Sequence, residues 1–527
     1  MVAAVALVAA AALISGFSMR NGIDPFDEGL MLQAARRVSA GQLPYRDFLW
    51  AYGPAQPYLL AGLFKLLGPS LLQWRIVRAL ADAGISLVAW LLVRDRTPAP
   101  LAGIVWLAVA CEISEPRSAD PFPLALLAVL VALLVASRCG RDRRGGPDRS
   151  GAAAAGLLVA LAAAFRIDFA LYGLVAVAVV LAARPGAGVG VAARFCLIAV
   201  VVGALVYLPF AIAIGPADLY RALIGNSLAT RAYWTLPFPL HFHPPAGAGV
   251  AKTAKKALDF YVPVLVLIGF ALTTAAALHA WWRARRPQPL ALGLIVAGAG
   301  LLAYMTSRAD AFHVQPAFVV VAVALGLVAG RRPPVRAGVR PSRTLPGGLT
   351  NLPHGTLGAA AAVLLAALTL HGVANRLSAL VHPAAAATLR IPVADGVQAP
   401  PAEARAIDRM VGLVDARTRP GQPIYVLPRR PDLVTFNDPL IYVLTQRPNP
   451  TSQDFGLEAG AAAQARIVAT LSRVRPRVIV RWTDPLSSTP EPNQRGRPTG
   501  VHTLNRWVAA HYRVLARLYH YTVLVPR

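Results

Sequence analysis

The sequence predicts a polytopic α-helical membrane protein with about eleven spans and a small extracytoplasmic α/β domain at its C-terminal end. Its 527 residues are 56% hydrophobic and only 15% charged, and its mean hydropathy of +0.53 is too apolar for a water-soluble domain with a polar surface. Apolar runs of membrane-spanning length recur up to about residue 380 and then stop, and basic residues fall in every second loop between them. These observations exclude an ordinary cytosolic enzyme.

The predicted spans are apolar runs close to the 20 or so residues that cross about 30 Å of hydrocarbon. The two runs that Arg166 and Asp168 separate could instead form one long broken helix. The first run has no basic segment before it and no evident cleavage site, so we interpret it as an anchor rather than a signal peptide. The eleven runs lie at approximately 1–18, 69–93, 99–114, 121–137, 151–165, 169–183, 195–214, 260–282, 289–306, 313–329 and 356–376.

The net charge of +27 is interpreted as a consequence of genome composition and membrane topology. Only four basic residues are lysines, and Arg, Ala, Gly and Pro are all abundant, as is typical of a GC-rich genome. Short loops rich in Lys and Arg stay in the cytoplasm. We therefore favour topology signals over lipid or nucleic-acid recognition for these loops, and we expect no nucleic-acid partner. The alternating basic loops contain Arg94 and Arg96; Arg138, Arg141, Arg143, Arg144 and Arg149; Arg184 and Arg194; Arg283, Arg285 and Arg286; and Arg331, Arg332, Arg336, Arg340 and Arg343.

This alternation predicts the orientation of the chain in the inner (plasma) membrane. The N-terminus is expected in the cytoplasm and the C-terminal domain outside it. Functional residues are expected to face outward. The outer regions are then 19–68, a turn near 115–120, the Arg166 region, 215–259, the Arg308 region and everything after about 377.

Two domains are expected, a transmembrane domain at 1–381 with a first outer loop at 19–68, and an α/β domain at 382–527. In the second domain, strands are predicted from Ile424 to Leu427, Val478 to Trp482 and Tyr521 to Val525, and helices at 401–417, 459–475 and 501–517. The three cysteines, Cys111, Cys139 and Cys196, lie in or beside apolar runs, so no disulfide framework is expected.

Carboxylates gather directly after the first span. Asp24, Asp27 and Glu28 come first, and Tyr45, Arg46 and Asp47 follow after a helical stretch. The adjacent carboxylates Asp27 and Glu28 could serve as a general base and its orienting or metal-binding neighbour. They could equally cap the N-terminus of the following helix, where negative charge is favoured.

Charged residues also interrupt the apolar pattern at the outer ends of later spans. Arg78 and Asp82, near Arg75 on one helix face, are explained by a structural ion pair. Arg166 with Asp168, and Arg308 with Asp310 and His313, are more informative because arginine binds phosphate in a bidentate manner. The alternative for these arginines is local neutralisation by the neighbouring aspartates.

The outer segment 215–259 adds Arg231, His241 and His243. The two histidines lack a nearby third ligand, so no metal site is expected. No Walker loop, GxSxG, HExxH or CxxC motif is present in the sequence.

This layout resembles the polytopic glycosyltransferase C superfamily, which includes dolichyl-phosphate-mannose protein mannosyltransferase-like and lipid A aminoarabinose transferase-like enzymes. The resemblance covers nearly the whole chain. The matching stretches are Asp27-Glu28-Gly29, the segment from Gly41 to Phe48, Gly53-Pro54 before Tyr58-Leu59-Leu60, and the segment from Arg308 to His313.

The resemblance implies transfer of a sugar, hexosyl or pentosyl, from a polyprenyl-phosphate carrier among the membrane lipids to a lipid, glycan or protein acceptor on the outer face. By motif position Asp27 is the expected base, and Glu28 orients it or the acceptor. Asp24 is a second nearby carboxylate and an alternative base. No cofactor is implied. Arg166, Arg308 and Arg231 are expected to hold the carrier phosphate, chiefly because of their charge and predicted location.

Two other function classes remain open at this stage. A polysaccharide polymerase or ligase would use Arg231, His241 and His243 in a large outer loop, although the Asp27-Glu28 pair argues against it. A transporter would need charged or broken helices near the bilayer midplane, whereas the charges here gather at one surface.

Overall fold

A computed structural model describes most of the chain. The described residues are 2–118, 120–139, 148–185, 188–244, 247, 249–284, 288–330, 354–381, 385–433, 435–454, 458–488 and 498–527. The basic residues Arg141, Arg143, Arg144, Arg285, Arg286, Arg331, Arg332, Arg336, Arg340 and Arg343, on which much of the topology prediction depends, lie outside the described residues.

Eleven apolar helices of the described chain coincide with the eleven predicted runs. Six are long and apolar enough to cross a membrane and five are shorter, so the exact number of spans stays a prediction. They are α1 (Val2–Gly16), α4 (Leu71–Val93), α5 (Ala99–Ile113), α6 (Phe122–Arg138), α7 (Arg149–Phe165), α8 (Ile167–Ala183), α9 (Gly188–Ile214), α12 (Val250–Ala284), α13 (Pro289–Ser307), α14 (Ala311–Ala329) and α15 (His354–Val381).

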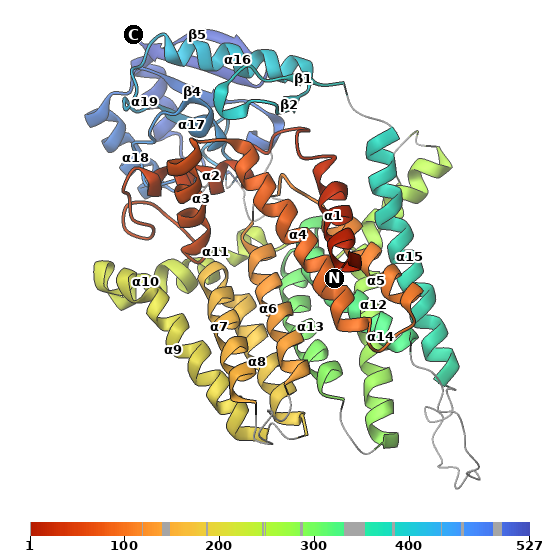
Figure 1. The fold of residues 1–527 in the computed structure, drawn as a ribbon. Helices are drawn as coiled ribbons and strands as arrows, with labels where there is room; N and C mark the ends of the chain where they lie inside the picture. Colours follow the sequence, from red (N-terminus) through yellow and green to blue (C-terminus); the bar gives the residue numbers. More distant parts are fainter. Residues whose placement is uncertain are drawn as a thin grey trace, which may run out of the picture.

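The helices form a bundle with the C-terminal domain at one end (Figure 1). The turn at Arg166 separates two helices that lie side by side, so the alternative of one long broken helix is wrong. Arg94 and Arg138 both contact Asp95 at the end of the bundle opposite the C-terminal domain. These described arginines therefore gather away from the domain, as the alternating pattern predicts.

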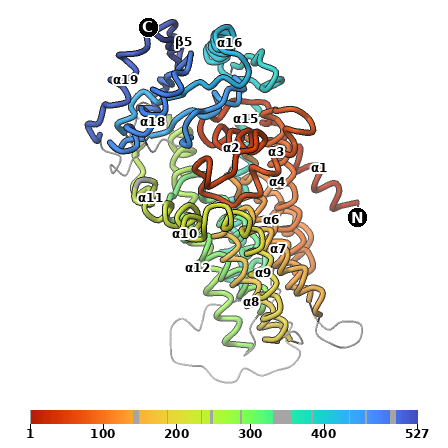
Figure 2. Tube along the Cα trace, turned by 90° about the vertical axis from the view of Figure 1, so that its left-hand side faces the viewer, coloured from red at the N-terminus to blue at the C-terminus, as the bar shows by residue number. Residues whose placement is uncertain are grey.

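Short helices at the domain end of the bundle come from two outer segments. The first segment forms α2 (Asp27–Ser39) and α3 (Ala55–Leu67). The second forms α10 (Pro216–Tyr220), one π-helical turn at Arg221–Gly225 and α11 (Asn226–Trp234). Figure 2 shows α2 and α3 between the bundle and the C-terminal domain, and α2 shares one apolar cluster with that domain.

The C-terminal domain is built on a four-stranded sheet in the order β3-β4-β6-β5. The parallel pair is β3 (Tyr425–Pro428) and β4 (Ile479–Trp482), and antiparallel pairing adds β6 (Tyr521–Pro526) and β5 (Tyr512–Leu518). The helices of the domain are α16 (Pro401–Asp415), α17 (Leu440–Thr445), α18 (Ala461–Val474) and α19 (Thr503–His511), and β1 (Ala387–Thr388) pairs with β2 (Gln398–Ala399). Short 3₁₀ turns lie at Pro392–Ala394 and Pro485–Ser488.

Most predicted elements of this domain are confirmed, and one is wrong. The helix predicted at 501–517 ends at His511, and the remaining residues form β5. The reason is tertiary: β5 pairs with β6 along its length, and Tyr512 and Leu518 are buried at its two ends. Cross-strand pairing therefore overrides the helical pattern of the sequence.

Candidate active site

Asp27 begins α2 at the junction between the bundle and the C-terminal domain. Its side chain is half-buried, and within the described residues no group hydrogen-bonds to its carboxylate. Burial raises the pKa of Asp27 well above its usual range, and the charges of Asp24, Asp120 and Asp310 raise it further, while Arg308 lowers it. The site therefore contains an uncommitted carboxylate with enhanced basicity.

Asp24 has the capping role that the sequence left open. Its Oδ1 accepts hydrogen bonds from the backbone N–H groups of Phe26 at 3.1 Å and Asp27 at 3.0 Å. Burial, followed by the charge of Glu28, raises the pKa of Asp24 to about 6. Because its oxygen already supports the start of α2, Asp24 is less available to a substrate than Asp27 is.

Glu28 faces the helix bundle. It is fully buried and forms a bidentate ion pair with Arg75 of α4, at 2.6 and 2.7 Å. Arg75 also donates to the backbone carbonyls of Met19 and Gly22. This geometry does not favour contact between Glu28 and an acceptor; it fixes α2 to the bundle and so positions Asp27.

Gly29 completes the motif because it lets the C-terminal domain approach α2. A Cβ atom at this position would lie 2.4 Å from the backbone nitrogen of Leu440, a distance that real Cβ contacts do not reach. Leu440 in turn donates its N–H to the carbonyl of Pro25 at 3.4 Å. The three consecutive residues of the motif thus face the site, the bundle and the domain.

Arg166 is surrounded by carboxylates and aromatic rings. Its guanidinium donates to both oxygens of Asp120 at 2.9 and 3.0 Å and to both oxygens of Asp168 at 3.0 and 2.7 Å. The rings of Tyr52 and Tyr304 lie 5.3 and 4.8 Å from it. This arrangement favours local neutralisation over the phosphate-binding role expected from the sequence, since nearly all of its N–H donors are engaged.

Arg308 is more accessible than Arg166, with 20% of its side chain exposed against 9%. Its Nε donates to Asp310 at 2.9 Å and its Nη1 to the carbonyl of Trp234 at 2.9 Å. Asp310 caps α14 by accepting from the N–H groups of Phe312 and His313. Burial acts to raise the pKa of Asp310, but the hydrogen bond and charge of His313 outweigh it, so this pKa lies below its usual range. Asp310 is therefore a stable counter-charge beside Arg308.

The first outer loop supports the site through its backbone. The Tyr45 hydroxyl donates to the carbonyl of Tyr52 at 2.6 Å. This hydrogen bond fixes the loop segment that carries the Tyr52 ring. The N–H of Gly53 donates to the Phe165 carbonyl at 3.0 Å, and a Cβ there would lie 2.2 Å from the Ala164 carbonyl oxygen. These contacts explain two of the motifs on which the resemblance rests.

Other predicted site residues lie further from this cluster. Arg46 and Asp47 form an ion pair with each other, and Asp47 also caps its own turn at the Leu43 N–H. Arg231 is exposed on α11, whose last residue supplies the carbonyl that Arg308 contacts. Among the described residues, no three His, Cys, Asp or Glu side chains are placed to hold a metal ion together, His241 and His243 included.

Sequence reasoning missed four contributors to the site. They are Asp120, Tyr52, Tyr304 and the Phe436 ring of the C-terminal domain, which lies 4.6 Å from the ring of Phe26. The available signal for Asp120 was its position in the predicted outer turn, directly before Pro121 and an apolar run. No comparable signal marks the aromatic residues, which come from the loop before α3, from α13 and from the C-terminal domain.

The arrangement was compared with known proteins. No family model and no curated protein matches the chain. Solved structures do match: ArnT from Cupriavidus metallidurans has a TM-score of 0.56 in the apo state and 0.57 bound to undecaprenyl phosphate, at 17% and 16% identity, and each alignment covers 99% of this chain and 97% of that one. Both structures are polytopic glycosyltransferases of the C superfamily.

The chain has the glycosyltransferase C fold. The arabinofuranosyltransferase AftD from Mycobacteria also matches, with a TM-score of 0.50 and 16% identity over 99% of this chain and 41% of that one. Together with its apolar helices, this fold makes the chain a multi-pass membrane protein. The polytopic α-helical fold with a small C-terminal α/β domain that the sequence predicts is confirmed.

Proposed function

We propose that the protein is an integral-membrane glycosyltransferase that moves a sugar from a polyprenyl-phosphate carrier to a lipid, glycan or protein acceptor on the outer face of the membrane. The observation that carries this proposal is Asp27, a carboxylate with no hydrogen-bond donor among the described residues, close enough to Arg308 for the charge of that arginine to lower its pKa. The site stands where the bundle meets the C-terminal domain. A lipid-borne donor and an acceptor outside the membrane can both reach such a junction.

Asp27 is the proposed base. Its carboxylate takes the proton of the acceptor hydroxyl as the acceptor oxygen forms a bond to the anomeric carbon of the sugar. The bond between that carbon and the carrier phosphate oxygen breaks, and the electron pair leaves with the phosphate. Because a phosphate is a stable leaving group, the reaction needs positive charge near it more than it needs an acid.

Arg308 is the proposed phosphate ligand, with Arg231 as the second positive charge. Arg308 retains 20% of its side-chain exposure, whereas Arg166 retains 9%. Arg166, by contrast, holds Asp120 and Asp168 and so shapes the floor of the site. We therefore assign Arg166 a positioning role instead of phosphate binding.

The donor class is supported by the likeness to ArnT, whose structure contains undecaprenyl phosphate. The likeness to AftD supports the transfer of a sugar. Neither likeness indicates whether the sugar is a hexose or a pentose. The orientation, with a cytoplasmic N-terminus and the domain at 382–527 outside the inner membrane, is part of the same proposal and rests on the alternating basic loops.

Transfer of labelled sugar tests the proposal. Membranes containing the protein are supplied with labelled sugar on polyprenyl phosphate, and we expect label to pass to a membrane or envelope acceptor in the wild type but not in Asp27→Asn. The matched control is Asp47→Asn, an aspartate of the same loop whose carboxylate is paired with Arg46. Uptake of label into inverted vesicles without transfer would identify a transporter and would contradict the proposal.

A further inference from the structure

A cavity of about 420 Å³ lies at the end of the bundle opposite the candidate active site. Its walls come from α12, α13 and α14, and its rim comes from the chain after α4 and from the C-terminal ends of α6 and α8. Its size falls in the range of ligand-binding cavities. Nothing in the proposed transfer reaction uses it.

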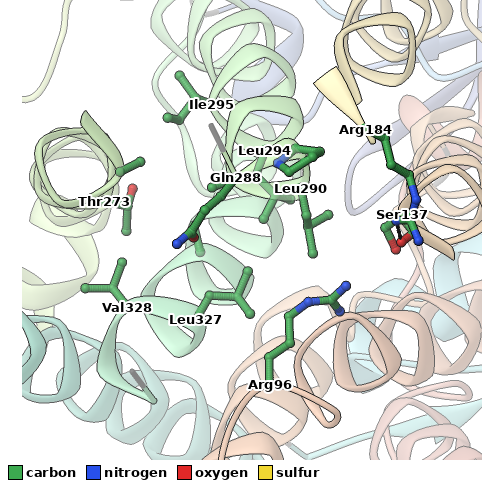
Figure 3. A pocket seen from close by; sticks show the side chains of 14 residues that line it. Arg96, Ser137, Arg184, Thr273, Gln288, Leu290, Leu294, Ile295, Leu327 and Val328 are labelled. Carbon is green, nitrogen blue, oxygen red and sulfur yellow. Dashed lines mark hydrogen bonds between the residues drawn. The ribbon is translucent and has the colours of Figure 1, made fainter. Parts of the chain in front are cut away.

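The walls and the rim of this cavity differ in character. Leu290, Leu294 and Leu327 line the interior, whereas Arg96 and Arg184 stand at the rim (Figure 3). Arg184 donates to the backbone carbonyl of Ser137, and Figure 3 shows the Arg96 guanidinium extending toward the side where these two residues lie. An apolar interior with a cationic rim matches a molecule with an apolar chain and an anionic head.

The two rim arginines are not neutralised within the described part of the chain. Asp95, a carboxylate at this end of the bundle, pairs with Arg94 and Arg138, and no ion pair of Arg96 or Arg184 occurs among the described residues. Burial lowers the pKa of Arg96, and the like charges of Arg184 and Arg138 lower it further, while Asp95 opposes them. A local excess of positive charge therefore remains at the rim.

We propose that this cavity binds one anionic phospholipid of the surrounding leaflet. Its phosphate lies between Arg96 and Arg184, and the first part of an acyl chain lies along Leu290 and Leu294. Basic pockets between transmembrane helices on the cytoplasmic side are suited to anionic head groups, and this end of the bundle is the one with the basic loops. The lipid neutralises the rim and fills the space between α12, α13 and α14.

Native mass spectrometry of the full-length protein with phosphatidylglycerol tests this proposal. We expect the wild type to retain one phosphatidylglycerol and the double variant Arg96→Gln/Arg184→Gln to bind it at least tenfold more weakly. The matched control, Arg94→Gln/Arg138→Gln, removes the same charge from the same end of the bundle without altering the cavity and should retain the lipid. Equal binding by both double variants would overturn the proposal.

A second variant addresses the apolar part of the site. Ala291→Phe places a ring in the cavity from a half-buried wall position while leaving both arginines unchanged, and it should also lose the bound lipid. Retention by this variant would show surface attraction only and would overturn the assignment to the cavity. Preferential retention of polyprenyl phosphate over phosphatidylglycerol at equal concentration would also overturn it, in favour of the carrier lipid.

Discussion

Two loops of the bundle share one local motif and differ in their surroundings. Arg166 and Arg308 each end a helix in an extended conformation, and each is followed two residues later by an aspartate that its guanidinium contacts. Asp120 and a set of aromatic rings then surround Arg166, leaving 9% of its side chain exposed. Arg308 meets a backbone carbonyl instead and keeps 20% exposure.

This contrast teaches that tertiary neighbours decide what an Arg-x-Asp turn does. The guanidinium of Arg166 donates to two carboxylates and has few N–H groups left for a third anion. The summed charge of Arg166, Asp120 and Asp168 is negative. The more exposed guanidinium of Arg308 is accessible to a phosphate. Four predictions test this division of roles. The first concerns Asp27, whose pKa is shifted by Arg308 and by Asp120, the partner of Arg166.

The largest effect is expected for Asp27→Asn, which keeps the shape of the side chain and removes its basicity. Turnover should fall by a factor on the order of 10² to 10⁴ while donor binding persists. Single-turnover transfer measures this. Asp24→Asn is the control and should lose far less, since an Asn oxygen can still cap α2. Full activity of both variants would remove the proposed mechanism, and loss in Asp24→Asn alone would move the base three residues upstream.

Arg166→Gln should act chiefly on stability. Removing the guanidinium leaves the buried Asp120 without its partner, and breaking a buried ion pair in this way costs about 3 to 5 kcal/mol. A lower unfolding temperature of the purified protein in detergent measures the loss. Asp120→Asn in the same background should recover part of it. An Arg166→Gln variant that is as stable as the wild type would restore the phosphate-binding interpretation.

Arg308→Gln should act chiefly on the donor. A charge-assisted contact to phosphate contributes about 1.5 to 3 kcal/mol, so kcat/KM for the lipid-phosphate donor should fall roughly 10- to 150-fold, with little change in unfolding temperature. Donor titration at fixed acceptor measures this, and Arg46→Gln in the outer loop serves as the charge-matched control. Unchanged donor dependence would assign Arg308 to structural pairing with Asp310.

The smallest effect is expected in the pH profile. Asp27 must be ionised to act as a base, so activity is lost as pH falls through its raised pKa. The charge of Asp24 contributes to that rise, and because the pKa of Asp24 is about 6, Asp24 is mostly ionised at neutral pH. Asp24→Asn should therefore shift the acid limb of the kcat/KM profile to lower pH. A shift to higher pH would contradict the coupling between the two carboxylates.

The bundle was largely predictable because membrane thickness dictates helix length and composition. Each of the eleven apolar runs contains a helix, including the pair around Arg166. The prediction of the C-terminal domain failed where strand pairing overrides a helical pattern, even though the partner strand β6 follows β5 directly in the sequence. β5 was read as helix because its partner β6 determines its conformation.

The candidate site was predictable as a location but only partly in its roles. Asp27 and Glu28 are adjacent, and successive residues of a helix point about 100° apart, so one faces the site and the other the bundle. Helical geometry alone could have separated them. The difference between Arg166 and Arg308 could not be read from sequence, because it depends on Asp120 from the turn before α6 and on Tyr304 from α13.

The buried ion pair between Arg37 of α2 and Asp454 of the C-terminal domain, with Nε and Oδ2 separated by 2.7 Å, also has a consequence during synthesis. The two residues are 417 positions apart. At ~5–20 residues per second, the helix that carries Asp27 leaves the ribosome about 20–80 s before its partner exists. During that interval α2 stays without the contacts that Leu440 and Asp454 later provide. The helix that carries the proposed base is thus among the first parts of the protein to be made and among the last to reach its final packing.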